Sequence, residues 1–469
     1  MSEEPTTEIE EEERPEEREE QDYSLRTPFV QSVLEATFAD DVVTLSELLD
    51  PLHPADIADL LEQIGAGPRR ELLMLWGESV DGDILSELDE TIREDVIATL
   101  SPETLTEAVR ELDSDDVVDL VEDLEEDQQE AILEALPAAD RIAVEEALSW
   151  PEESAGRLMQ REVVRAPEHW SVGQMIDFMR AEGRELPEQF YHVILIDPKM
   201  HPVGYVALGR ILASPRAVLL AEIKEDSFRT VPVDQDEGEV AYAFNQYHLI
   251  SVPVVDEGER LVGVITIDDA MAVLDDEAEE DILRLAGVSD ESRVTDRVWE
   301  TTKRRFPWLA VNLVTAIMAS LVIDQFEAVI AQLVALAVLM PIVASMGGNA
   351  GTQSLTVAVR AIATKDLTGS NVWRVIRREV LVGLLNGLAF AALMGLVGWI
   401  WFGTPMLGVV LALAMVINLV VAGLAGILVP VVLDKFSIDP ALASGAFVTT
   451  VTDVVGFFAF LGLAAVLLL

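Results

Sequence analysis

Apolar residues recur along this chain with three different spacings, and each spacing predicts a different kind of structure. Over residues 40–148, Leu, Ile and Val recur at helical spacing in short segments that Pro or Gly separates. Over residues 159–273, β-branched runs alternate with turns, which is typical of short strands. Beyond residue 305 the chain consists mainly of long apolar runs. The pattern therefore predicts stacked short helices, then an α/β region, then a membrane region.

The apolar runs beyond residue 305 are each close to or longer than the ~20 residues that cross a hydrocarbon core about 30 Å thick. Lys and Arg precede the first run and lie between the second and third, whereas the loops after the first and third runs contain neither. The positive-inside rule then predicts a multi-pass protein of the cytoplasmic membrane with its N-terminal half in the cytoplasm and its C-terminus outside. The predicted spans are 306–323, 328–346, 380–402, 406–433 and 441–469.

A repeat divides the β-rich region. The segment "HVILIDPKMHPVGYVAL" (192–208) aligns with "SVPVVDEGERLVGVITI" (251–267) at an offset of 59 residues, which pairs Asp197 with Asp256 and Gly204 with Gly263. Each copy reads as a strand, an acidic turn and a second strand. These tandem units resemble a CBS-domain pair, a cytoplasmic sensor module that often binds nucleotides or ions.

Charge is distributed very unevenly along the chain. The formal net charge is −53, yet residues 301–469 carry a net charge of +2, so the first 300 residues carry −55. A polyanion of this size repels nucleic acid and attracts cations. The chain has no cysteine, and its five histidines lack metal-ligand spacing, so the sequence favours oxygen ligands for any bound cation. Residues 1–22 are nearly all charged or polar and are predicted to form a disordered acidic tail.

The stretch "PIVASMGGNAGTQS" (341–354) interrupts an apolar run with polar and small residues. One interpretation is a broken helix whose glycines bring backbone carbonyls close to a passing ion, with Asn and Gln supplying neutral oxygens. The alternatives are a loop at the cytoplasmic face or a tight contact between helices through small residues. The candidate pore-lining residues here are Gly347, Gly348, Asn349, Gly351 and Gln353.

The last apolar run contains one ionisable residue, Asp453. A carboxylate at membrane depth is costly unless it faces water, an ion or a partner. Asp453 belongs to a small and polar stripe at helical spacing, which predicts a pore lining, with a polar packing seam as the alternative. A single carboxylate beside neutral oxygens suits Mg²⁺, which keeps most of its waters, and a symmetric dimer would double that carboxylate. The other stripe members are Gly445, Thr449, Thr452 and Gly456, and Asn418 belongs to a weaker stripe in the preceding run.

The motifs "PIVASMGGNAGTQSLTVAVR" (341–360) and "DPALASGAFVTTVTDVVGFFAFLGLA" (439–464), together with the order of the regions, closely resemble the MgtE family of magnesium channels. The resemblance implies a homodimer in which the second and fifth spans line the Mg²⁺ pathway and Asp453 holds a hydrated ion. It also implies that cytosolic Mg²⁺ closes the pore as negative feedback.

With this resemblance, the chain is predicted to be a multi-domain membrane protein. The parts, in order, are the disordered tail (1–22), an α-superhelical N-terminal domain (23–155), an α/β CBS-domain pair (156–274), a long connecting or plug helix (275–305) and a five-helix transmembrane bundle (306–469).

The resemblance also places regulatory Mg²⁺ sites on acidic residues of the cytoplasmic half. They fall on Asp269, Glu277, Glu280 and Asp281, with Asp113, Asp115, Asp116 and Asp119 as looser candidates. Ala272 stands where relatives can have an acid, so the number of regulatory ions stays open, as does ATP binding at the CBS pair. The residues themselves leave a solvated charged face as the alternative for the connector acids.

The sequence therefore predicts a non-enzymatic, homodimeric Mg²⁺-selective channel that takes up magnesium and that cytosolic Mg²⁺ closes. Its partners are Mg²⁺ and membrane lipid, with no nucleic acid. Two alternatives stand beside this prediction. One is a coupled secondary transporter of divalent cations, and the other is a membrane-anchored nucleotide sensor.

Overall fold

The computed structural model describes residues 25–469 except 123, 125, 182–185, 188–189, 226, 289–297 and 437. The predicted acidic tail, 1–22, lies outside the described residues. The chain divides into two compact units, Met1–Leu274 and Asp275–Leu469, which are described separately below.

The first unit begins with short helices, as the helical spacing predicts. Several begin at the signals that the sequence provides: the Asp41 carboxylate accepts a hydrogen bond from the Thr44 N–H, and Pro54 occupies the first turn of its helix. Their apolar faces form one continuous core. The elements are α1 (Thr27–Phe38), α2 (Val42–Leu49), α3 (Pro54–Gln63), α4 (Ala66–Trp76), the 3₁₀ helix η1 (Gly77–Ser79), α5 (Gly82–Ser86), α6 (Glu90–Ile97), α7 (Pro102–Glu111), α8 (Ser114–Glu122), α9 (Glu126–Ala135) and α10 (Ala138–Ala147).

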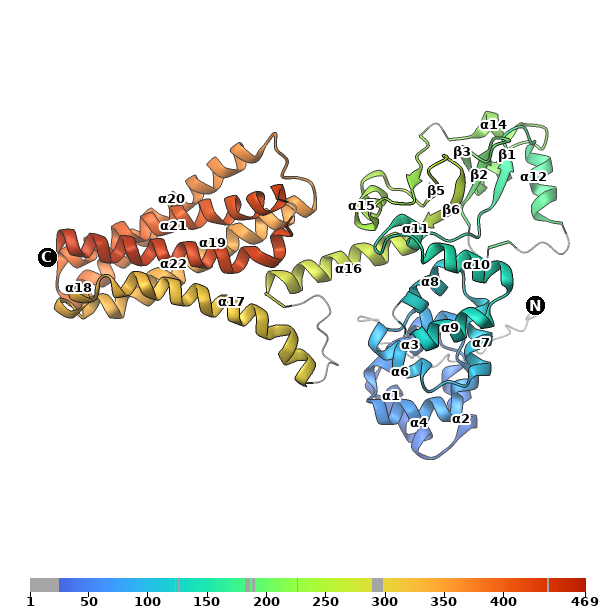
Figure 1. Ribbon diagram of the computed structural model, residues 1–469, viewed down its shortest axis with the longest axis horizontal. Coiled ribbons are helices and arrows are strands. Elements are labelled where there is room, and N and C mark those ends of the chain that lie inside the picture. The colour runs from blue at the N-terminus through green and yellow to red at the C-terminus, as the bar shows by residue number, and fades with distance from the viewer. Residues whose placement is uncertain are drawn as a thin grey trace, which may run out of the picture. The chain divides into compact units, whose positions relative to one another are not determined.

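The rest of the first unit contains the two repeats, and each forms a three-stranded sheet (Figure 1). The first sheet comprises β1 (Arg165–Pro167), β2 (His192–Ile196) and β3 (Pro202–Ala207), and the second comprises β4 (Val231–Pro232), β5 (Ser251–Val255) and β6 (Leu261–Thr266). The helices are α11 (Ala155–Leu158), α12 (Val172–Met179), α13 (Leu208–Ala213), α14 (Leu220–Ile223), α15 (Glu237–Tyr247) and α16 (Ile267–Leu285), the last of which continues into the second unit.

The two sheets have the same register, which confirms the repeat. His192 pairs with Ala207 in the first sheet, and Ser251 pairs with Thr266 in the second, in each case across an antiparallel ladder. In both sheets the middle strand is also parallel to the first strand. The repeat-equivalent residues His192 and Ser251 meet, with 2.6 Å between the His192 Nδ1 and the Ser251 Oγ.

Helix α16 ends earlier than the predicted connecting helix, 275–305. The Val288 N–H donates to the Leu283 carbonyl and the Gly287 N–H donates to the Arg284 carbonyl, both at 2.9 Å. Gly287 has φ +73°, a left-handed conformation that glycine adopts without strain. These bonds form a Schellman motif, which terminates a helix. Residues 289–297 lie outside the described part, and 298–305 belong to the first membrane-region helix, so the prediction of one helix over 275–305 is wrong.

Among the described residues of the second unit, five helices are long and apolar enough to cross a membrane. Figure 1 shows four of them, α19 to α22, running alongside one another. Helix α21 lies at the centre of the bundle, since a larger share of its span is buried than of any other described membrane helix. The elements are α17 (Val298–Asp324), the short α18 (Glu327–Gln332), α19 (Ala335–Ala363), α20 (Val372–Phe402), α21 (Pro405–Lys435) and α22 (Pro440–Leu467).

The stretch 341–354 is not a break. Helix α19 runs through it without interruption, with Pro341 inside the helix, and ends only at Ala363. Both the broken-helix interpretation and the predicted end of the second span at residue 346 are therefore wrong. The physical reason is that the small residues face neighbouring helices, whose packing stabilises a helix that Pro and Gly would otherwise disfavour.

Candidate metal sites and the membrane helices

The glycines of α19 allow close contact with two other helices. A Cβ built on Gly347 would lie 2.2 Å from the Asn418 Nδ2 of α21, and one built on Gly351 would lie 2.6 Å from the Val448 Cγ1 of α22. From the α21 side, a Cβ on Gly426 would lie 2.7 Å from the Gly351 carbonyl oxygen. These glycines therefore allow tight packing between helices, which is the small-residue contact given above as an alternative interpretation of the stretch.

Gly426→Ala is expected to destabilise the bundle, because the new methyl group meets the backbone of α19, which cannot move aside as a flexible side chain can. Overpacking of this kind costs about 1–3 kcal/mol. Thermal unfolding of the purified protein in detergent should show a lower Tm. Gly348→Ala is the matched control, because the nearest atom to its Cβ is 4.0 Å away. Equal Tm values for the two variants would contradict this view of the packing.

Asn418 lies at the junction of three helices and is fully buried. Its Nδ2 donates to the Val343 carbonyl at 2.8 Å, and its side chain touches the positions of Gly347 and Gly456. Its Oδ1 has no hydrogen-bond partner in the part of the chain that the structure describes. The structure thus places this candidate pore residue inside the monomer, between α19, α21 and α22.

The polar side chains of α22 fall into two groups. The hydroxyls of Thr449, Thr450 and Thr452 donate to backbone carbonyls of the helix itself, and Thr452 is fully buried. Asp453 differs, because it is only partly buried and no described residue forms a hydrogen bond or ion pair with it. Gly348, Asn349, Gln353, Gly445 and Thr449 are also not fully buried in the monomer.

In the first unit, the structure brings together part of the predicted regulatory acids. Asp115 and Asp116 lie in the first turn of α8, and Asp269 lies in the first turn of α16, where its Oδ2 accepts a hydrogen bond of 2.6 Å from the Thr266 hydroxyl. Burial, followed by the charge of Asp269, raises the pKa of Asp116 to about 7. Burial also raises the pKa of Asp269 to about 6 and that of Asp115 well above its usual range. Asp113 adds repulsion at all three.

Two contacts hold α8 against the segment before β1. The Ser114 hydroxyl donates to the Glu162 Oε2 at 2.8 Å and accepts from the Arg161 N–H at 2.8 Å. At the other end of α8, Glu122 forms an ion pair with Arg157. Asp115 and Asp116 are therefore held near the second sheet by contacts that do not involve their own carboxylates.

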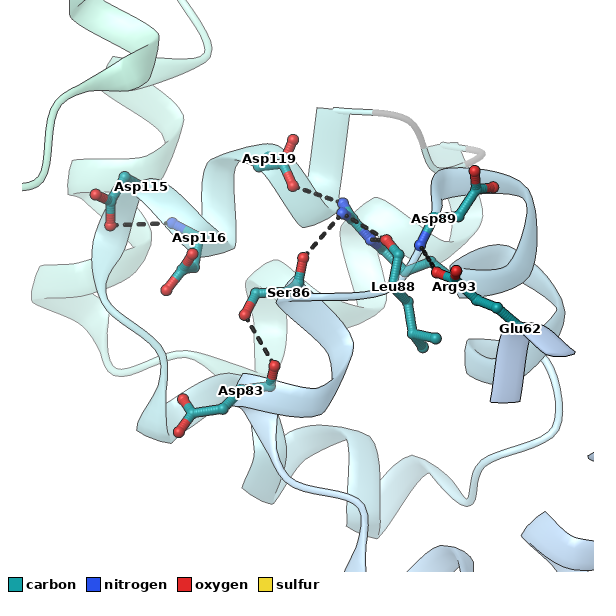
Figure 2. A network of polar contacts seen from close by, with 9 residues as sticks. All are labelled: Glu62, Asp83, Ser86, Leu88, Asp89, Arg93, Asp115, Asp116 and Asp119. Atoms are coloured by element: carbon teal, nitrogen blue, oxygen red, sulfur yellow. Dashed lines mark hydrogen bonds and ion pairs between the residues drawn. The ribbon is translucent and has the colours of Figure 1, made fainter. Parts of the chain in front are cut away.

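Asp119 belongs to a different network (Figure 2). It points toward Arg93, whose Nη1 lies 2.7 Å from the Asp119 Oδ2, and the same guanidinium donates to the carbonyls of Leu88 and Ser86. Arg93 is buried, with 7% of its side chain exposed. No described Lys or Arg forms such an ion pair with Asp115, Asp116 or Asp269. Arg93 balances the charge of Asp119, whereas no described Lys or Arg balances the charges of the other three acids.

No group of three or more described Asp, Glu or His side chains is already arranged to hold a metal ion. The carboxylate of Asp269 is close enough to raise the pKa of Asp115 and Asp116, but the three side chains do not form a closed ligand shell. The regulatory role of these residues stays a prediction.

The raised pKa values predict how pH acts on this cluster without divalent cations. Because the folded pKa values of Asp116 and Asp269 lie above the usual 3.8, the folded state binds more protons between pH 4 and about 7, and stability falls as pH rises through this window. The first thermal transition of the protein in EDTA should thus occur at a higher temperature at pH 5.5 than at pH 8. Asp115→Asn combined with Asp116→Asn should flatten this dependence, and an unchanged slope would contradict the assignment.

The connector acids lie in the part of α16 that belongs to the second unit. Glu280 forms an ion pair with Arg284, and the Arg284 Nη1 lies 2.8 Å from the Asp439 Oδ2 at the start of α22. Burial and the nearby Asp439 raise the pKa of Asp281. Glu277 is exposed on the same helix. Asp439 was not predicted as a site residue, although it begins the motif "DPALASG" and its carboxylate also caps α22.

Models of three known families match separate parts of the chain. The model described as "Divalent cation transporter" matches residues 340–463, the MgtE intracellular N domain matches 52–153, and the CBS domain matches 220–276. The magnesium transporter MgtE of Enterococcus faecalis is 34% identical over 318 residues, which cover 68% of this chain and 70% of that protein. The chain belongs to the MgtE family.

Further MgtE proteins are similar over the same extent. The magnesium transporter MgtE of Thermus thermophilus is 35% identical over 320 residues, which cover 68% of this chain and 70% of that protein. A crystal structure of the cytosolic domain of the Mg²⁺ channel MgtE in complex with ATP is 29% identical, with a TM-score of 0.48, and covers 52% of this chain and 99% of that chain. Membership of the MgtE family confirms the predicted helical domain, CBS pair and membrane helices, and it supports magnesium transport as the function of this chain.

Proposed function

We propose that this MgtE protein is a Mg²⁺-selective channel that admits Mg²⁺ across the cytoplasmic membrane and closes when cytosolic Mg²⁺ rises. The observation that carries the proposal is Asp453. It is a carboxylate inside a candidate span, partly buried and without a described partner, on a helix whose threonine hydroxyls are satisfied internally. A carboxylate kept at membrane depth in this way has the expected property of an ion-pathway residue.

The pathway lies between two copies of the chain in this proposal. One Asp453 is a weak site, whereas a two-fold axis beside α22 brings two carboxylates together and doubles the charge. Mg²⁺ sheds its waters reluctantly, so it passes with most of its hydration shell, and the carboxylates accept hydrogen bonds from the bound waters. The candidate lining residues that the monomer does not bury are Gly348, Asn349, Gln353, Gly445 and Thr449. The N-terminal unit faces the cytoplasm and the C-terminus faces outside, as the distribution of Lys and Arg supports.

In this proposal, the channel opens and closes through the acidic residues that no described Lys or Arg pairs with. At low cytosolic Mg²⁺, Asp115, Asp116 and Asp269 repel one another, which loosens the attachment of α8 to the start of α16. Mg²⁺ bound among these carboxylates turns repulsion into attraction and favours one arrangement of α16 by RT ln(1 + [L]/Kd) per site. Helix α16 is continuous to Leu285. Fixing the position of its first turns therefore also restricts the movement of Arg284, which forms an ion pair with Asp439 at the start of α22. Ions at Glu277, Glu280 and Asp281 are part of the same proposal.

Divalent flux into proteoliposomes tests the proposal. Purified protein should conduct Mg²⁺ down its gradient without a proton gradient, and Mn²⁺, Co²⁺ and Ni²⁺ tested at equal concentrations establish its selectivity. Flux that requires a proton gradient would indicate a coupled transporter. The absence of any divalent flux from correctly folded protein would favour an anchored sensor instead.

A further inference from the structure

A second polar site lies in the membrane unit, away from the Asp453 stripe. A cavity of about 170 Å³ opens between α19, α20 and α21. Its polar lining consists of the side chains of Gln353, Ser354, Glu379 and Asn386, and the remaining lining is aliphatic or glycine. All four polar residues lie within the candidate membrane spans.

The cavity arises from how α20 and α21 meet. A Cβ on Gly383 would lie 2.6 Å from the Leu419 carbonyl oxygen, and one on Gly423 would lie 2.9 Å from the Glu379 carbonyl oxygen. The two backbones therefore touch at these glycines, where no side chains are present to fill the adjacent space. Polar side chains of α19 and α20 project into that space, although aliphatic side chains would satisfy a purely structural contact.

The charge of Glu379 is not balanced by the protein. The Ser354 hydroxyl donates to its Oε2 at 2.9 Å, and within the described part of the chain no Lys or Arg forms an ion pair with it. The Arg377 guanidinium instead lies 5.3 Å from the centre of the Trp373 ring. A carboxylate within a candidate membrane span is costly unless it faces water, an ion or a partner. A counter-charge from solution would offset that cost.

The cavity offers the ligands of a hard cation. One carboxylate, one hydroxyl and the side-chain carbonyls of Gln353 and Asn386 are all oxygen ligands of the kind that Mg²⁺ and Ca²⁺ prefer. Since a water occupies about 30 Å³ of liquid volume, 170 Å³ holds an ion together with several of its waters. We infer that this cavity binds a partly hydrated divalent cation between α19 and α20, with Glu379 as the charged ligand.

This site is separate from the proposed pathway. Gly348 and Gly351 lie on the face of α19 that meets α22, whereas Gln353 lies on the cavity side. Gln353, a candidate pore residue, is thereby assigned to this site instead. A cation in this cavity connects α19 to α20. Its binding does not depend on conduction at Asp453.

Iron-directed cleavage of the full-length protein tests the inference. Fe²⁺ replaces the bound cation, and with ascorbate and hydrogen peroxide it generates hydroxyl radicals that oxidise and cleave nearby backbone, which mass spectrometry locates. We expect cleavage close to residues 353–354 and 379, suppressed by excess Mg²⁺. Glu379→Gln keeps the shape of the side chain and an acceptor for Ser354, and should reduce this cleavage about tenfold or more.

Asp453→Asn is the matched control and should leave cleavage at the cavity unchanged. This comparison also distinguishes the present inference from the proposed channel, because cleavage at 353–354 and 379 persists even where Asp453 carries no ion. Wild-type protein without cleavage at these positions would overturn the inference. So would cleavage that Mg²⁺ does not suppress, or that a folded Glu379→Gln variant with an unchanged Tm retains in full.

Discussion

Asp453→Ala is expected to reduce Mg²⁺ uptake into proteoliposomes by about 100-fold or more, because it removes the one carboxylate of α22 that lies within its candidate span. Two unit charges 4 Å apart interact by about 4 kcal/mol at an effective dielectric constant of 20, and a divalent ion doubles the charge on one side. The same variant should retain its oligomeric state on size-exclusion chromatography and its Tm, since no described hydrogen bond depends on Asp453.

Two further variants separate charge from shape. Asp453→Asn keeps the side-chain volume and should lose nearly as much flux as the alanine variant. Asp434→Ala is the matched control, because it removes the same charge from the exposed end of α21 and should leave uptake close to wild type. Wild-type uptake by a folded Asp453→Ala protein would show that α22 does not line the pathway and that its polar stripe is only a packing seam.

The triple variant Glu277→Ala, Glu280→Ala and Asp281→Ala is expected to keep the channel open at high internal Mg²⁺. Each ion site at ten times its Kd contributes RT ln 11, about 1.4 kcal/mol, to the closed state. Loss of two or three such sites shifts the equilibrium between closed and open channel by about 100- to 1,000-fold. Flux at high internal Mg²⁺ should therefore approach the flux at low Mg²⁺, whereas the wild type is strongly inhibited.

Hydrogen exchange supplies a second readout for the same variant. Mg²⁺ should slow exchange of the α16 amides in the wild type and have a smaller effect in the triple variant. Asp275→Ala combined with Glu279→Ala serves as the control, since both residues are exposed on the same helix and lie outside the predicted ligand set. If the triple variant closes with the Mg²⁺ dependence of the wild type, these acids are a solvated face and the sensor lies elsewhere.

The sequence predicts local structure well where the signal itself is local. The 59-residue repeat predicts two equivalent sheets, and the matching registers of His192 with Ala207 and Ser251 with Thr266 confirm this. Helical spacing predicts the short helices, because caps such as Asp41 act within one turn. The membrane helices follow from length and apolar content alone.

The errors concern residues whose role depends on a distant neighbour. Gly347 and Gly351 suggested a break in the second membrane helix. The sequence does not show that Asn418 and Val448 pack against these glycines and so stabilise the helix. The connector was predicted too long, although the Gly at position 287 marks the end of α16. The partners of Asp439 and Glu379 come from other helices, so their significance appears only once those helices are placed.

The most direct test of the account is Mg²⁺ influx into proteoliposomes whose internal Mg²⁺ is set before the assay. We predict rapid influx when internal Mg²⁺ is chelated, and progressively slower influx as internal Mg²⁺ approaches millimolar concentrations, with no requirement for a proton gradient. Influx that does not change with internal Mg²⁺, in protein whose N-terminal unit faces the lumen, would contradict the claim that the acidic cytoplasmic unit closes the channel.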